Sequence, residues 1–153
     1  MSHASGLIDK LALQPHPEGG WYREIYRSPT RVETARGSRS AITTIYYLLE
    51  RQQLSRWHVV QADELWHFYA GAPLQLLEYD PTTRRLMRHE LSETSVGVIP
   101  AGVWQAARSL GEYSLVGCTV GPGFDFADFQ FTSDLPSHAD HFKGDLASFA
   151  NLL

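Results

Sequence analysis

The sequence contains a single cysteine, Cys118, which excludes an internal disulfide bond. No apolar run approaches the roughly 20 residues that a membrane-spanning helix needs. The first residues also lack the basic and then apolar layout of a secretory leader. Positive charge is scarce, because 13 Lys and Arg stand against 17 Asp and Glu, whereas a nucleic-acid-binding protein would show a basic stripe. We therefore expect a cytoplasmic protein that binds neither nucleic acid nor membrane.

The chain of 153 residues has the size of one domain. Because it contains no internal repeat and no linker, residues 1–153 are expected to form a single domain around a core at about residues 20–133. Short runs rich in aromatic and β-branched residues follow one another without alternating helices, which predicts an antiparallel sandwich or barrel. The expected strands are residues 21–27, 41–49, 56–60, 64–69, 74–79, 85–91, 96–99, 103–108, 113–120 and 128–132.

Two short helices are expected at the ends of this all-β chain. Residues 5–13 carry apolar side chains at helical spacing, and Ser5 is a candidate cap. The tail from Pro136 places Phe142, Leu146 and Phe149 along one side of a second amphipathic helix.

Three polar residues on different expected strands can share one cavity. Side chains alternate across a strand, so His58, Glu64 and Gln105 meet if their faces all turn inward. On a regular strand His67 then points outward. A carboxyl group, an imidazole and an amide are costly to bury unless they are paired or used. The residues that share these faces would form the apolar wall of a ligand pocket: Val60, Trp66, Phe68 and Val103.

Two further segments bear on this pocket. Residues 16–20 could form a loop that closes one barrel mouth, with Tyr22, Glu24 and Tyr26 on one face of the next strand; the alternative is a simple turn before an edge strand. Residues 121–129 carry too many aromatic side chains for a solvated loop, so we expect them to pack against the barrel or a second subunit.

The chain resembles the cupins, whose first motif is similar to G-x5-H-x-H-x3,4-E-x6-G and whose second is similar to P-x-G-x2-H. His58, Glu64 and Gly71 match the first motif, and Pro100 and Gly102 match the second. The sequence is similar in particular to a small-cupin group long described as a domain of unknown function, the cupin-5 group. The segments that carry this resemblance are 16–24, 43–49, 63–71, 100–106 and 121–129. The resemblance implies a double-stranded β-helix, or jelly-roll barrel, and a homodimer.

Two departures from the general cupin pattern concern metal binding. Val60 stands where the second histidine of the first motif would be, and Gln105 replaces the histidine of the second. A cupin with the full pattern would hold a metal with three histidines and a glutamate. We therefore expect no tightly held transition metal, although His58, Glu64 and Gln105 remain weak candidate ligands for a divalent ion.

Three functions remain open at this point. In a metal-independent isomerase or epimerase acting on a sugar-like or keto-acid compound, Glu64 and His58 would act as acid and base, and Gln105 would donate to a developing enolate oxygen. In a metal-dependent dioxygenase or lyase the same residues would be ligands. In a non-catalytic protein the barrel would hold a metabolite, and fold alone does not choose among the three.

Overall fold

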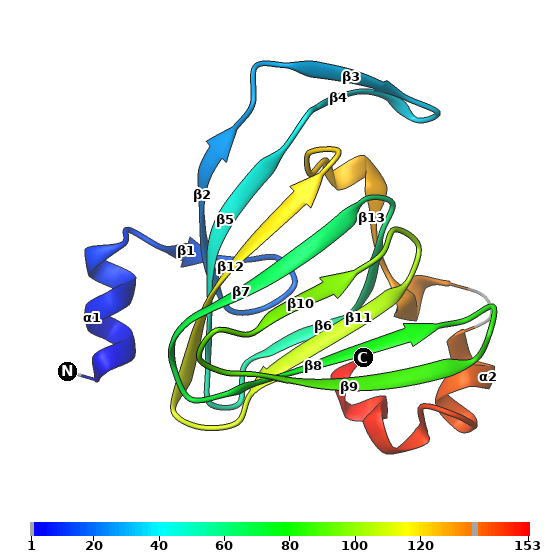
Figure 1. Cartoon of the computed structure of the whole chain (residues 1–153). Helices are drawn as coiled ribbons and strands as arrows, with labels where there is room; N and C mark the ends of the chain where they lie inside the picture. Colours follow the sequence, from blue (N-terminus) through cyan, green and yellow to red (C-terminus); the bar gives the residue numbers. More distant parts are fainter. Residues whose placement is uncertain (1, 136–137) are drawn as a thin grey trace.

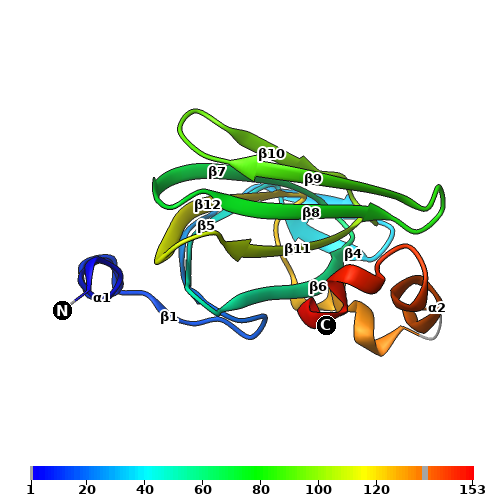
Figure 2. The ribbon, with the colours of Figure 1, turned by 90° about the horizontal axis from the view of Figure 1, so that it is seen from below.

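The computed structural model describes residues 2–135 and 138–153 and has the expected all-β architecture. Two antiparallel sheets face each other and form a jelly-roll barrel (Figures 1 and 2). The six-stranded sheet has the order β1(Gln14–Pro15), β2(Trp21–Arg27), β5(Thr43–Glu50), β12(Tyr113–Gly121), β7(Asp63–Gly71), β10(Val96–Ile99). The five-stranded sheet has the order β13(Phe129–Phe131), β6(Leu54–Val60), β11(Trp104–Ser109), β8(Leu74–Asp80), β9(Arg85–Leu91). The predicted fold class is confirmed.

One hairpin was not predicted from the sequence. Strands β3(Arg31–Thr34) and β4(Gly37–Ser40) pair with each other and extend beyond the barrel (Figure 1). This segment is rich in charged and small residues, so it lacks the apolar alternation that marks a half-buried strand. Arg39 of β4 is nevertheless buried and forms a two-bond ion pair with Asp128, which fastens the hairpin to the segment before β13.

Short helices are present at both ends of the chain, as predicted, but their bounds differ from the predicted ones. Helix α1(His3–Lys10) is capped by Ser2, whose hydroxyl oxygen accepts a hydrogen bond from the Ser5 N–H at 3.1 Å, and not by Ser5. Helical spacing located the apolar face correctly. The helix begins about one turn earlier than predicted and ends at Lys10, so Leu11 and Ala12 lie beyond it. Ser5 is the residue whose N–H the cap satisfies.

The C-terminal segment covers the outer face of the five-stranded sheet. It contains η2(Thr132–Asp134), α2(His138–Lys143) and η3(Ala147–Leu152), while the predicted start at Pro136 lies outside the described residues. Phe142, Leu146 and Phe149 are buried there as expected, against Trp57 and Trp104, but they do not share one helix: Phe142 lies on α2, Phe149 on η3 and Leu146 just before η3. Helix α1 lies on the far side of the barrel from this segment (Figures 1 and 2). None of the described helices is long and apolar enough to cross a membrane.

The barrel interior is densely packed at one end only. The buried cluster between the sheets includes Tyr47, Leu49, Trp66, Leu76 and Val116, and Phe68 and Val103 pack against it. These side chains come from both sheets and fill the space between them. The other end of the interior holds a cavity.

Candidate ligand-binding and catalytic site

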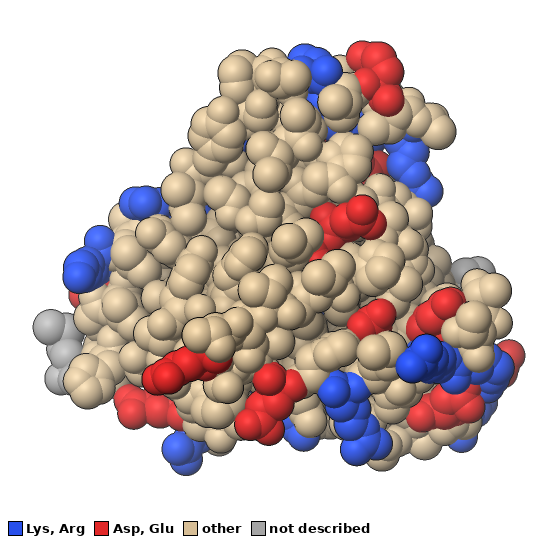
Figure 3. Space-filling model, viewed as in Figure 1, with Lys and Arg blue, Asp and Glu red and all other residues tan. Residues whose placement is uncertain are grey.

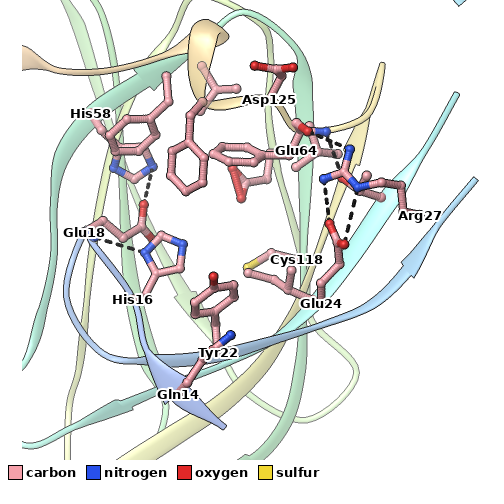
Figure 4. A pocket seen from close by; sticks show the side chains of 17 residues that line it. Gln14, His16, Glu18, Tyr22, Glu24, Arg27, His58, Glu64, Cys118 and Asp125 are labelled. Carbon is pink, nitrogen blue, oxygen red and sulfur yellow. Dashed lines mark hydrogen bonds and ion pairs between the residues drawn. The ribbon is translucent and has the colours of Figure 1, made fainter. Parts of the chain in front are cut away.

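A cavity of about 550 Å³ lies between the two sheets, at the end of the barrel that the core does not fill (Figure 4). Its wall is contributed by β1, β2, β5, β6, β7 and β12, and by the segments 16–18 and 124–129. A volume of this size suits a small molecule. The expected aromatic segment 121–129 therefore packs over the barrel, where Phe124, Phe126 and Phe129 line the cavity.

The loop 16–20 brings Glu18 into the barrel. Its conformation depends on Gly19, because φ is +108° there and a Cβ would lie 2.0 Å from the Leu54 carbonyl oxygen. The Tyr47 hydroxyl donates a hydrogen bond to the carbonyl oxygen of Gly19 and ties the loop to β5. As a result Glu18 is only 7% exposed although it lies in a loop, and it lines the cavity.

Glu18 and His58 form a buried pair in the cavity wall. His58 Nδ1 lies 2.6 Å from the Arg56 carbonyl oxygen, which can only accept, so Nδ1 carries a proton. His58 Nε2 lies 3.2 Å from Glu18 Oε2, within ion-pair distance. Ser55 donates to the other Glu18 oxygen at 3.1 Å. The ring of Phe129 stacks on the imidazole at 5.1 Å, so both partners are held in place.

Glu64 belongs to a second chain of hydrogen bonds. The indole N–H of Trp66 donates to Gln105 Oε1 at 2.9 Å, and Gln105 Nε2 donates to Glu64 Oε1 at 3.0 Å. Because an indole nitrogen is only a donor, this order fixes the direction of the Gln105 amide. Gln105 lies behind Glu64 and does not line the cavity, so it orients the carboxyl group instead of reaching a ligand.

Burial raises the pKa of Glu64 to about 8. The nearby negative charge of Glu18 contributes to this rise, and the hydrogen bond from Gln105 opposes it by a smaller amount. At neutral pH the Glu64 carboxyl group is therefore mostly protonated. The cavity therefore holds two carboxyl groups with different partners. Glu64 can donate a proton, and Glu18 is paired with the imidazole of His58.

The structure divides the predicted site residues into two groups. His58, Glu64, Val60, Tyr22 and Glu24 line the cavity (Figure 4). The other residues expected in the pocket wall lie in or against the packed core: Trp66, Phe68 and Val103. They point inward as the strand alternation predicts, but at the filled end. His67 lies on the other face of β7, opposite Val96 and Gly117 in the register.

A β-bulge changes the expected face of β2. The register passes from Glu24 opposite Ile45 to Tyr26 opposite Thr44, so Ile25 is the extra residue. Tyr22 and Glu24 therefore face the cavity, whereas Tyr26 turns outward and is 52% exposed. Arg27 takes the inward position and pairs with Glu24 at 2.6 Å.

Sequence reasoning did not assign roles to His16, Glu18, Arg27 or Asp125, all of which line the cavity. The one available signal was the composition of residues 16–20, where a histidine and a glutamate precede two glycines. Such a segment can fold closely against other backbone, but its partners lie on β5 and β6, far along the chain.

The model of the Cupin_5 family, described as "Cupin superfamily (DUF985)", matches residues 5–132. The chain belongs to the Cupin_5 family. A hypothetical protein from Leishmania major is 33% identical, with a TM-score of 0.78 over 93% of this chain and 97% of that one. A Shewanella oneidensis protein is 31% identical, with a TM-score of 0.81 over 95% of this chain and 96% of that one.

A more distant neighbour shows the cupin fold alone. Oxalate decarboxylase from Bacillus subtilis is 14% identical, with a TM-score of 0.63 over 91% of this chain and 36% of that one. Among curated proteins, none matches this Cupin_5 chain.

The donor groups of this Cupin_5 site do not fit a transition metal. In the part of the chain that the structure describes, no three His, Cys, Asp or Glu side chains are grouped so that they could hold a metal ion. Gln105 turns its amide nitrogen to Glu64 and its oxygen to Trp66, so it cannot replace the missing histidine. His58 uses both ring nitrogens within the protein.

Proposed function

We propose that this Cupin_5 protein binds a small molecule in the barrel cavity and transfers protons on a carbon next to a carbonyl group, as an isomerase or epimerase does. The observation that carries this proposal is the presence of two carboxyl groups in one cavity with different partners. Glu18 is held by Ser55 and His58, and Glu64 is held by Gln105. Two carboxyl groups in different surroundings, one of which burial keeps protonated, are typical of acid–base catalysis.

The roles follow from the two environments. Glu18 would remove the proton, and the electron pair of the broken C–H bond would move onto the carbonyl oxygen as an enolate. Glu64, which burial keeps protonated, would return a proton to the carbon. Exchange with water then resets both carboxyl groups. His58 and Gln105 act through Glu18 and Glu64, so they are positioning residues in this scheme.

The experiment is solvent-deuterium incorporation, which needs no knowledge of the product. A panel of neutral sugars and keto acids would be incubated with the protein in D₂O, and C–H signals next to carbonyl groups followed by NMR. For a compound that exchanges, we expect Glu64→Gln and Glu18→Gln to slow exchange by at least about 100-fold. Glu112→Gln, at an exposed position, is the matched control and should exchange at the wild-type rate.

Each other outcome has a definite meaning. A wild-type exchange rate in Glu64→Gln contradicts the role of Glu64. Saturable binding without exchange of any panel member favours a non-catalytic metabolite-binding protein. Elemental analysis of protein purified without a metal-affinity column is the remaining check. About one transition-metal ion per subunit, lost in His58→Ala, would contradict the metal-independent scheme.

We also propose a homodimer, which the outer face of the six-stranded sheet supports. Tyr26, Tyr69, Val96 and Val98 are each 52% exposed there. In Figure 3 a broad uncharged area covers the middle and left of the view, over β12 and much of β7, and charged groups lie mainly around it. Strand β10 is also a free sheet edge. A second copy would offer the same uncharged surface.

Light scattering coupled to size exclusion tests this assembly. We expect a dimer for the wild type and a monomer for Val98→Lys, because a buried unpaired ammonium group opposes association. Leu110→Lys is the control, since Leu110 is also exposed but lies in the β11–β12 connection. A monomeric wild type at micromolar concentration would contradict the proposal.

A further inference from the structure

His16 presents a hydrogen-bond donor to the cavity. Its Nδ1 accepts a hydrogen bond from the Glu18 backbone N–H at 3.0 Å, so Nδ1 carries no proton and the ring proton is on Nε2. Edge contacts with the rings of Tyr22 and Tyr47 hold the imidazole in this position. In Figure 4 the second ring nitrogen of His16 faces the middle of the cavity.

This donor carries no positive charge. Burial lowers the pKa of His16 and outweighs the opposite effect of Glu18, and the nearby His58 lowers the pKa further. The hydrogen bond from the Glu18 N–H leads to the same conclusion, because a protonated Nδ1 could not accept it. A neutral imidazole can bind an oxygen atom of a ligand without selecting for negative charge.

The basic side chains in the cavity wall already have partners within the protein. Arg27 bonds through Nη2 and Nε to the two oxygens of Glu24, at 2.6 and 3.3 Å, and through Nη1 to the Phe124 carbonyl oxygen. His58 faces Glu18. Among the described residues that line the cavity, Arg27 is the one Lys or Arg. A carboxylate or phosphate on a ligand would therefore find no free cation.

The remaining charge in the wall is negative. Asp125 lines the cavity, makes no ion pair within the described part of the chain, and caps the Ala127 N–H with Oδ1. An anionic ligand would lose its hydration beside this carboxylate without compensation. A neutral ligand would instead find carboxylate acceptors for its hydroxyl groups.

Aromatic side chains form another part of the cavity wall. Phe124, Phe126 and Phe129 contact one another edge to face, and Phe126 is 56% exposed. They offer an apolar surface to the C–H groups of a ligand, while the polar groups opposite bind its oxygens. A pocket with an apolar wall and a few placed polar groups is the usual form of a small-molecule site.

We propose that the ligand of this cavity is an uncharged, oxygen-rich compound, and that His16 binds one of its carbonyl or hydroxyl oxygens through Nε2–H. This inference rests on the proposed function, because it names the class of molecule that occupies the same cavity. It favours a sugar-like compound over a keto acid. His16 also takes over the role of oxygen donor that the sequence had suggested for Gln105.

The test is a binding series with matched neutral and anionic probes. Neutral aldoses, ketoses and polyols would be titrated against the protein at low ionic strength beside the corresponding uronates and 2-keto acids, with ligand-observed NMR as the readout. We expect the neutral member of a pair to bind at least about tenfold more tightly. Tighter binding of the uronate or keto acid overturns the proposal, as does the failure of every neutral probe to bind at millimolar concentration.

Two variants of His16 separate ligand binding from loop structure. In His16→Asn the carboxamide oxygen can replace Nδ1 and keep the bond from the Glu18 N–H, but no donor remains at the place of Nε2. In His16→Gln an amide N–H can reach that place. For a neutral probe we expect affinity to fall about tenfold in the Asn variant and to recover partly in the Gln variant. Wild-type affinity in a folded Asn variant overturns the role of His16.

Binding and proton exchange can fail independently. Neutral probes that bind but show no deuterium incorporation would leave the ligand class standing and remove the proposed chemistry. Deuterium exchange confined to keto acids would support the proposed chemistry and contradict the proposed ligand class. The Asp125→Asn variant provides a further check on charge. Because it removes a negative charge from the cavity wall, it should reduce the difference in affinity between a neutral probe and its uronate.

Discussion

The two ends of the barrel interior are built from the same strands but have opposite characters. On β5, Ile45 lines the cavity, whereas Tyr47 and Leu49 are fully buried in the packed end. On β7, Glu64 lines the cavity and Trp66, two residues further, is fully buried. The alternation of side chains therefore decides which residues face inward, and position along the barrel axis decides whether they meet a ligand or one another.

A line of hydrogen bonds joins the two ends. It runs from Trp66 in the packed core through Gln105 to Glu64 at the cavity. The packed end provides the rigid support, and the open end carries a carboxyl group whose pKa burial has raised to about 8. The cavity is thus positioned by residues that no ligand touches.

The largest expected effect tests the difference in packing on one strand. Leu49→Ala removes a fully buried side chain from the filled end and should lower the free energy of unfolding by about 4 kcal/mol. Ile45→Ala on the same face should cost about 1–2 kcal/mol, because its side chain borders the open cavity. Denaturant unfolding of both variants measures the two losses in the free energy of unfolding. Equal losses would mean that the two ends do not differ in packing.

A second prediction concerns the cost of the buried Glu64 carboxyl group. Its pKa is about 8 in the folded protein against an ordinary value of 4.5, so the folded state holds this proton more tightly. The associated stability is fully present below about pH 4.5 and is lost as the pH rises to about 8. Glu64→Gln keeps the acceptor for Gln105 without the charge. It should be about 3 kcal/mol more stable than the wild type at pH 7.

Unfolding curves at several pH values measure that difference. The two proteins should have similar stability near pH 4, and the gap should widen up to about pH 8 and then remain constant. Glu112→Gln, at an exposed position, should show no such widening. A gap that does not depend on pH would show that Glu64 is charged in the folded protein at neutral pH.

The smallest effect tests the link between the two ends. Trp66→Phe removes the donor to Gln105 and should cost about 1–2 kcal/mol, because a buried carbonyl oxygen is left without a partner. The amide is then free to turn, and loss of its bond to Glu64 should raise the pKa of that carboxyl group further. Trp57→Phe is the matched control, since its indole donates to Phe149 in the C-terminal segment. An NMR titration of Glu64 that gives the same pKa in both variants would contradict the link.

Several features could be predicted from the sequence because they depend on local patterns. Strands β2, β9 and β10 have the predicted bounds, since alternation and turn residues mark them clearly. His58 and Glu64 were found because polar residues on inward faces are unusual. The bulge at Ile25 could not be predicted, because an extra residue in a pairing depends on the partner strand.

The sequence by itself determined the all-β class, the Cupin_5 motifs and the inward faces of His58 and Glu64. Only the tertiary structure decided which inward residues lie in the cavity, because depth in the barrel depends on how strands from both sheets meet. It also placed Glu18 beside His58, since a loop can reach the interior only when its polar groups find distant partners. The protonation of Glu64 follows from the same assembly, because burial exists only once the barrel has closed.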